Sequence, residues 1–220
     1  MTPRVDIVSL GTLSCNPFWG DAGAVRAAHA TTTLIRDGDD CILVDPSLPA
    51  EILEARLAEQ TGLTPGRVTA VFLTNFRPVH RRGLALFPDV PWYLSDEERS
   101  ILEPQLERLV ESADEGADRE HPEEVAELEL LRRTSTAPDS LSRHVDLFPS
   151  PGVTPGACAL LVAGLRTIVV AGDAVLTGDH LDHGRIYERS VDPERAKSAL
   201  AEIIEIADII VPGHGNYAFR

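Results

Sequence analysis

The sequence predicts an α+β domain in which two mixed β-sheets pack together and helices lie outside them. Strand-like segments come first as hairpins, continue as a strand–helix–strand unit, and return as hairpins after a helical segment at about residues 96–142. A final helix and strand end the chain. This order fits neither one purely parallel sheet nor an all-β barrel, whereas two mixed sheets covered by helices use every piece. Because no recognisable linker interrupts the sequence, we expect one domain over residues 1–220.

The N-terminal segments predict three strands, which are residues 5–10, 31–36 and 41–44. The last two flank an aspartate- and glycine-rich stretch, residues 37–40, whose residue types favour a turn and therefore predict a hairpin. Residues 12–28 contain prolines and glycines and predict an irregular loop, which could lie over a site. Asp45 follows the third strand, where a carboxylate serves either as a turn former or as a site residue.

A helix is predicted over residues 49–60. Ile52, Leu53 and Leu57 recur there at helical spacing, and Gly62 is placed to end the helix. Short apolar runs rich in β-branched and aromatic residues then predict two buried strands, residues 69–74 and 92–94.

The segment from residue 96 to about 131 is rich in acidic residues and leucine and predicts two helices. We expect a break around Gly116 and the second helix to start near Pro122. Pro104 should kink the first helix or mark its true start. Residues 134–142 predict a polar loop. Its acidic residues predict a solvated face. The sequence leaves open whether the helical segment covers a site or forms a subunit contact.

The C-terminal part predicts four strands, which are residues 144–148, 158–162, 166–171 and 208–211. Residues 150–156 predict a rigid turn-rich loop, and residues 176–191 an irregular polar segment. Asp192 and Pro193 predict a helix start, with the aspartate as N-cap. That helix has one apolar face, formed by Ala196, Leu200, Ile203, Ile204 and Ala207.

The composition excludes several classes of function. A formal net charge of −15 disfavours nucleic acid and anionic membranes as partners. No apolar run approaches membrane-spanning length, and the N-terminus lacks a signal-peptide core. Cys15, Cys41 and Cys158 are far apart and form neither a disulfide framework nor a cysteine zinc site. We therefore expect a cytoplasmic protein, and the sequence leaves its oligomeric state open.

Polar residues at strand ends suggest a metal site. His80 lies in the loop after the predicted strand 69–74, Asp173 follows the strand that ends at Ala171, and His214 follows the last strand. Two imidazoles and a carboxylate can ligate zinc, manganese or iron and leave positions for water. From spacing alone this trio is weak, because a chain with 7 histidines offers such combinations by chance.

Five segments in order resemble the metallo-β-lactamase superfamily. They are Ile42-Leu-Val-Asp45, Val71-Phe-Leu-Thr-Asn-Phe-Arg-Pro-Val-His80, Ser150-Pro-Gly-Val-Thr-Pro-Gly156, Val169-Val-Ala-Gly-Asp173 and Ile210-Val-Pro-Gly-His-Gly215. The resemblance runs from the first hairpin to the C-terminus. It implies a four-layer αββα sandwich and a metal site built from loops at strand ends, with His80, Asp173 and His214 matching family ligands.

The same comparison shows where this chain departs from the family pattern. The family loop reads T-H-x-H-x-D-H, and here Asn75 and Arg77 replace its first two histidines and Val79 replaces its aspartate. Val153 replaces the histidine of the later turn, and Asp45 matches a carboxylate that supports the ligands. The resemblance thus implies that the first metal has lost its histidines and the second metal one of its four ligands. These departures argue against two-metal hydrolysis.

Three interpretations remain open from the sequence. The favoured one is a metal-free relative of hydrolases, in which Arg77 pairs with Asp173 and takes over the electrostatic role of a cation. The second is a one-metal hydrolase that uses His80, Asp173 and His214, with Arg77 binding a small anionic molecule. The third draws replacement ligands from a polar loop, namely Asp179, His180, Asp182 and His183.

Overall fold

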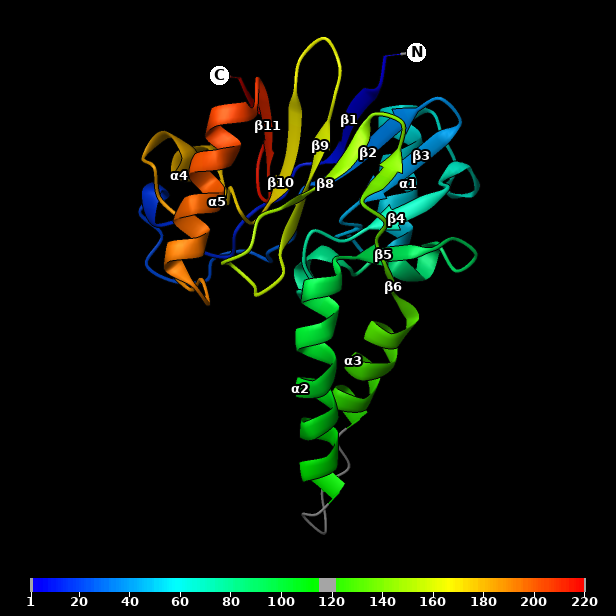
Figure 1. Ribbon diagram of the computed structural model, residues 1–220, viewed down its shortest axis with the longest axis vertical. Helices are drawn as coiled ribbons and strands as arrows, with labels where there is room; N and C mark the ends of the chain where they lie inside the picture. Colours follow the sequence, from blue (N-terminus) through cyan, green and yellow to red (C-terminus); the bar gives the residue numbers. More distant parts are fainter. Residues whose placement is uncertain (1, 115–121, 220) are drawn as a thin grey trace.

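Two six-stranded sheets face each other in the computed structural model, which describes residues 2–114 and 122–219 (Figure 1). The first sheet has the spatial order β1 (Arg4–Ser9), β2 (Thr32–Asp37), β3 (Asp40–Val44), β4 (Ala70–Phe72), β5 (Trp92–Leu94) and β6 (Ser135–Thr136). The second has the order β12 (Ala218–Phe219), β11 (Ile209–Pro212), β10 (Ile168–Gly172), β9 (Cys158–Val162), β8 (Val145–Pro149) and β7 (Ser140–Ser142). Both sheets are mixed, because β3 to β6 are parallel in the first and β10 and β11 in the second.

Helices lie outside the sheets (Figure 1). They are α1 (Ala50–Thr61), α2 (Asp96–Asp114), α3 (Pro122–Arg133), α4 (Gly178–Asp182) and α5 (Pro193–Ile206). Short 3₁₀ turns complete the described chain: η1 (Pro17–Trp19), η2 (Pro65–Arg67), η3 (Pro78–His80) and η4 (Leu84–Leu86). In Figure 1, α2 and α3 form a hairpin that projects from one end of the sandwich. Among the described helices, none is both long and apolar enough to cross a membrane.

The apolar core has three layers. Between the sheets, Phe72 of β4 and Leu160 of β9 belong to one buried cluster. On the outer face of the first sheet, α1 contributes Leu53, and on the outer face of the second, α5 contributes Leu200 and Ile203. Each fully buried side chain of this size contributes about 1.5–3 kcal/mol by leaving water. The predicted sandwich of two mixed sheets with outer helices is therefore confirmed.

Most predicted elements are confirmed within a residue or two. Helix α1 buries Leu53 and Leu57 but leaves Ile52 half exposed, so the apolar face is narrower than predicted. Gly62 ends this helix in the left-handed conformation. Asp192 caps α5 as predicted, since its side chain accepts hydrogen bonds from the backbone N–H groups of Glu194 and Arg195.

Some differences have a physical reason. Helix α2 starts at Asp96 and runs through Pro104, so Pro104 does not mark its start. The predicted break around Gly116 lies outside the described residues. The predicted loop 134–142 contains the strands β6 and β7, and the segment 176–191 contains α4. These elements have five residues or fewer, which is too short for a periodic pattern.

Asp37 links the two sheets at the end of β2. Its carboxylate is buried and accepts from Ser142 Oγ at 2.8 Å and His144 N at 2.9 Å, and it lies 2.8 Å from His144 Nδ1. Burial alone would raise the pKa of Asp37, but the hydrogen bonds from His144 and Ser142 lower it below its ordinary value.

Asp37→Asn should therefore lower the free energy of unfolding by about 1–3 kcal/mol. The NH₂ of the asparagine amide would replace one carboxylate oxygen and would face the donors of Ser142 and His144, which would lose an acceptor. Since the folded-state pKa of Asp37 is depressed, its stabilisation is present above the unfolded value of 3.8 and is lost as pH falls through the folded pKa. Urea unfolding of both proteins at pH 7 and in acid measures this. A gap between the two that stayed constant into acid would contradict the assignment.

Candidate functional site

His80, Asp173 and His214 come together at one edge of the two sheets. Asp173 and His214 follow β10 and β11, which are parallel neighbours, so the carboxyl ends of these strands place both side chains at the same edge. His80 ends η3 in the loop after β4 of the other sheet. One potential ligand atom from each side chain lies within 4.8 Å of the others, and all three residues are buried.

His80 lies between two carboxylates. Its Nδ1 is 2.9 Å from Asp45 Oδ2, and its Nε2 is 3.1 Å from Asp173 Oδ2. Burial opposes protonation of the imidazole, but the negative charges of Asp173 and Asp45 outweigh it and raise the pKa of His80 to about 10. In this arrangement the ring carries a proton on each nitrogen and is a cation at neutral pH.

Asp45 holds this loop from the end of β3. Its carboxylate accepts from Thr74 N at 2.9 Å and from Thr74 Oγ1 at 2.7 Å, in addition to its contact with His80. Its φ of 50° is the one positive value among non-glycine residues in the described ranges. A residue held in that region stores strain, and such strain is found mostly at functional sites. Of the two roles open to Asp45 from sequence, its contacts match the site residue.

Arg77 contacts Asp173 directly. Its Nη1 lies 3.1 Å from Asp173 Oδ2, and its guanidinium lies 4.7 Å from the centre of the Tyr187 ring. Burial disfavours the charged form of Arg77, yet Asp173 raises the pKa of the guanidinium above its ordinary value. Burial would likewise raise the pKa of Asp173, but the charge of His80 and the hydrogen bonds around it lower that pKa well below the usual range. Both groups are therefore ionised.

Asp173 Oδ1 is a buried oxygen that receives no hydrogen bond from any described residue. His214 Nε2 lies 3.3 Å from it but not in hydrogen-bonding geometry. His214 Nδ1 lies 2.9 Å from the carbonyl oxygen of His29, which can accept only if Nδ1 carries the proton. A neutral His214 would then present the Nε2 lone pair to Asp173 Oδ1, and a cation or a proton between the two atoms would relieve that repulsion.

Two glycines allow the backbone to approach this site. A Cβ at Gly213 would lie 2.6 Å from Asp173 Oδ1. A Cβ at Gly172 would lie 2.4 Å from Thr74 Oγ1, and Gly172 also has a φ of +53°. The glycines beside Asp173 and His214 in the sequence are thus required by the close contact between β10, β11 and the loop after β4.

The remaining predicted site residues are Asn75, Val79 and Val153, and each occupies a different place. The Asn75 side chain is buried, with Nδ2 3.3 Å from His80 Nε2 and 3.4 Å from Asp173 Oδ2. Val79 lines the neighbouring pocket, and its carbonyl accepts from Ala30 N. Val153 is buried in the loop between β8 and β9 and is not among the residues that line the pocket.

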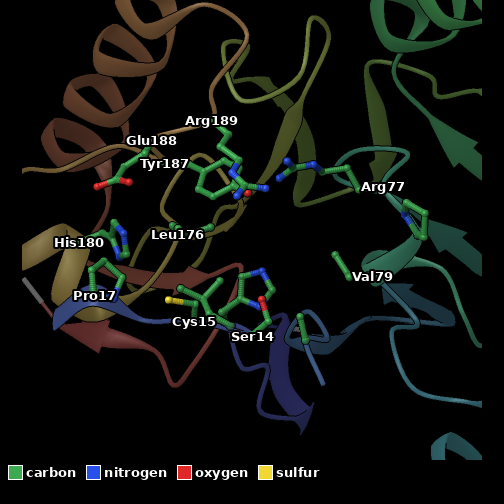
Figure 2. Close-up of a pocket in the computed structure, with 14 residues that line it drawn as sticks. Ser14, Cys15, Pro17, Arg77, Val79, Leu176, His180, Tyr187, Glu188 and Arg189 are labelled. Atoms are coloured by element: carbon green, nitrogen blue, oxygen red, sulfur yellow. The ribbon is translucent and has the colours of Figure 1, made fainter. Parts of the chain in front are cut away.

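A pocket of about 470 Å³ opens beside Arg77 and His214 (Figure 2). Its walls come from the irregular segment 12–28, the loop after β4 and the segment 176–189. The lining residues are Leu13, Ser14, Cys15, Pro17, Ala28, Arg77, Pro78, Val79, Leu176, His180, Tyr187, Glu188, Arg189 and His214. The expectation that residues 12–28 lie over a site agrees with this lining, whereas no described residue of the helical segment 96–142 is part of it.

The polar segment after β10 supports the pocket wall. Asp179 accepts from Asn16 Nδ2 at 3.2 Å and Trp19 Nε1 at 2.9 Å, which fastens the segment 12–28 to α4. His180 is buried with Nδ1 2.8 Å from Thr177 Oγ1, and burial lowers its pKa. The exposed residues Asp182 and His183 also lie outside the trio. Within the described residues, none of these four joins a metal-ligand cluster.

Glu98 is a supporting residue that sequence reasoning missed. It is 1% exposed, and its carboxylate accepts from Phe76 N at 3.2 Å and Gly156 N at 2.9 Å. It thereby joins the loop that carries Arg77 to the loop before β9. The available signal was Ser95-x-x-Glu98 at the start of α2, a capping pattern in which Ser95 Oγ does accept from Glu98 N.

Comparison with known proteins agrees with this architecture. The profile of the metallo-β-lactamase superfamily matches residues 25–214. Metallo-beta-lactamase domain-containing protein 1 of Xenopus laevis is 41% identical over 73 residues, which are 32% of this chain and 30% of that protein. The match thus spans under a third of the curated relative.

Solved structures share the fold at low sequence identity. A candidate metallo-β-lactamase from Thermotoga maritima superposes with a TM-score of 0.70 at 15% identity and covers 100% of both chains. AidC, a dizinc quorum-quenching lactonase, superposes with a TM-score of 0.68 at 16% identity over 87% of this chain and 75% of its own. These structures show a shared fold, and the profile match over most of the sequence shows that the chain belongs to the metallo-β-lactamase superfamily.

Proposed function

We propose that this protein is a metallo-β-lactamase-fold relative of hydrolases that has lost the two-metal site and the usual hydrolytic activity, and that binds a small anionic molecule without a metal. The observation that carries this proposal is the contact of Arg77 Nη1 with Asp173 Oδ2 at 3.1 Å. Asp173 matches the carboxylate that can bridge two metals in the family. In this chain the guanidinium of Arg77, a permanent cation, forms an ion pair with the Asp173 carboxylate.

The charges around Asp173 support the proposal. Asp45 and Asp173 carry two negative charges, while protonated His80 and Arg77 carry two positive charges, so the buried group is neutral as it stands. A buried carboxylate without a partner is costly, and the pairing of both carboxylates removes that cost. A divalent ion at His80 would have to displace the proton from Nε2.

The donor set does not fit two metals. Arg77 has no lone pair to offer, and Val79 and Val153 have apolar side chains. Asn75 has one oxygen that could ligate, but that Oδ1 accepts from Arg77 N at 3.0 Å.

The second candidate is a one-metal hydrolase that uses His80, Asp173 and His214. It is favoured by the unpartnered Asp173 Oδ1 and by the orientation of His214 Nε2 toward it. The trio fits one zinc, manganese or iron ion. If bound there, such an ion would supply Lewis-acid chemistry, which polarises a carbonyl or phosphoryl oxygen and can lower the pKa of water to about 7. Asp45 would keep His80 oriented through Nδ1, and Arg77 would bind an anionic group of the substrate.

Metal analysis separates the two candidates. We expect protein purified without chelator or added zinc to contain far less than one metal per chain, and its thermal stability to be unchanged by chelator. His214→Ala serves as the matched variant, because it removes one of the three ligands. A stoichiometric metal in the unmodified protein that disappears in His214→Ala would overturn the metal-free proposal.

A further inference from the structure

Two guanidinium groups converge in the pocket beside the trio. In Figure 2, Arg77 and Arg189 reach from opposite walls and point toward one another next to Tyr187. Like charges repel, so side chains that converge in this way favour an anion between them. The convergence is notable in a chain whose formal net charge is −15.

The two arginines differ in their partners. Arg77 is fixed by Asp173 on one side and by the Tyr187 ring on the other. The Arg189 side chain is exposed, and no described residue forms an ion pair or hydrogen bond with it. Glu188 also lines the pocket, but in Figure 2 it lies on the His180 side, away from the guanidinium pair. Arg189 therefore supplies a positive charge that the protein leaves unneutralised at this point.

The rest of the pocket is mainly apolar. Leu13, Val79 and Leu176 line it together with prolines and an alanine. Its volume of about 470 Å³ lies within the range of small-molecule sites. A ligand that satisfies both parts has an anionic group at the arginines and an apolar group against these side chains.

We propose that the pocket binds an organic carboxylate, held at its anionic end by Arg77 and Arg189 and at its apolar end by Leu13, Val79 and Leu176. This proposal rests on the metal-independent function proposed above. Arginine presents a planar fork that matches a carboxylate with two hydrogen bonds. Tyr187 stacks on Arg77, whose Nη1 contacts Asp173, so the guanidinium is held in place at the pocket wall.

The charge count favours a carboxylate over a phosphate monoester. Arg77 is already neutralised by Asp173, and the carboxylate of Glu188 lies away from the guanidinium pair, so Arg189 leaves one positive charge beside the ligand. A carboxylate carries one negative charge and balances it. A phosphate monoester carries between one and two charges at neutral pH and would leave an excess of negative charge in the pocket.

The test is a titration of the full chain, after chelator treatment, with 2-naphthoate, followed by the fluorescence of the ligand. We expect saturable binding of 2-naphthoate with a micromolar Kd. The neutral analogue 2-naphthamide should bind at least about tenfold more weakly. Arg189→Gln should weaken 2-naphthoate binding about tenfold, as the loss of a charge-assisted hydrogen bond predicts. Arg185→Gln is the control, since Arg185 is an exposed arginine of the same segment outside the pocket lining.

Several results would overturn the proposal. Equal binding of 2-naphthoate and 2-naphthamide would exclude anion recognition, and an equal effect of Arg185→Gln and Arg189→Gln would exclude the paired arginines. Tighter binding of 2-naphthyl phosphate than of 2-naphthoate would exclude the carboxylate class. A parallel titration of zinc-supplemented protein separates the two proposals: binding only with zinc would overturn the metal-free function as well, whereas no binding in either sample would overturn the carboxylate site alone.

Discussion

His80→Ala is expected to lower the free energy of unfolding by about 3–5 kcal/mol, because two buried carboxylates lose the cation between them. His80 is completely buried, and each of its ring nitrogens faces a carboxylate, Asp45 at 2.9 Å and Asp173 at 3.1 Å. Asp173 would keep Arg77, but Asp45 would keep only the hydrogen bonds from Thr74. The loss should be seen by urea unfolding at pH 7 in the presence of chelator.

The chelator decides what the loss of stability means. If His80 acted only as a metal ligand, chelator would lower the stability of the unmodified protein and largely abolish its difference from His80→Ala. If His80 is the cation of a neutral cluster, the full difference remains. His183→Ala is a suitable control, because His183 is exposed and lies outside the trio, and it should cost less than about 1 kcal/mol.

A run of apolar residues that ends in polar ones predicts a strand-end position for Asp173 and for His214, and the two strands concerned are parallel neighbours. That pattern alone does not group the two residues with His80, and the prediction that all three come together depended on the resemblance to the metallo-β-lactamase superfamily. The glycines beside Asp173 and His214 have a steric reason that the structure makes visible, since a side chain at Gly213 would collide with Asp173. Opposite charge predicts a contact between Arg77 and Asp173. The structure has it, with Arg77 Nη1 3.1 Å from Asp173 Oδ2, although the two residues are 96 positions apart in the sequence.

Other parts of the site depend on long-range contacts that local patterns do not contain. The acidic stretch at the start of α2 was interpreted as a solvated face, and three consecutive acidic residues do begin that helix. Asp96 and Glu97 are exposed, whereas Glu98 is buried. Nothing in the local composition distinguishes them. The difference arises because Glu98 faces two backbone N–H groups from distant loops, and only the assembled fold brings those groups there.

Arg189 and Tyr187 were missed for a related reason. They lie in a polar segment with no periodicity, in which the histidines and aspartates are the residue types that suggest metal ligands. In the structure, Asp179 fastens α4 to Trp19, His180 contacts Thr177 at the start of the same helix, and Tyr187 stacks on Arg77. An irregular polar segment therefore predicts a loop but does not say which of its side chains reach a pocket.

Glu98→Ala is expected to lower the free energy of unfolding by about 2–5 kcal/mol, since two buried N–H groups lose their acceptor and each costs about 1–3 kcal/mol. The affected donors are Phe76 N and Gly156 N. Glu98→Gln should cost less, because its amide oxygen can still accept from one of them. Glu97→Ala is the matched control, as its ion pair with Arg195 joins two half-exposed side chains and is worth about 0–1 kcal/mol.

Hydrogen exchange distinguishes this structural role from a general loss of stability. If Glu98 holds the two loops, the amides of Phe76 and Gly156 should exchange faster in Glu98→Ala than the fall in global stability requires, while amides in α5 should follow the global value. Equal acceleration throughout the chain would contradict the assignment. Because Phe76 lies directly before Arg77, local opening at Phe76 should also release the guanidinium from Asp173. Glu98 would then govern the site from outside it, through the backbone of the loop that carries Asn75, Arg77 and His80.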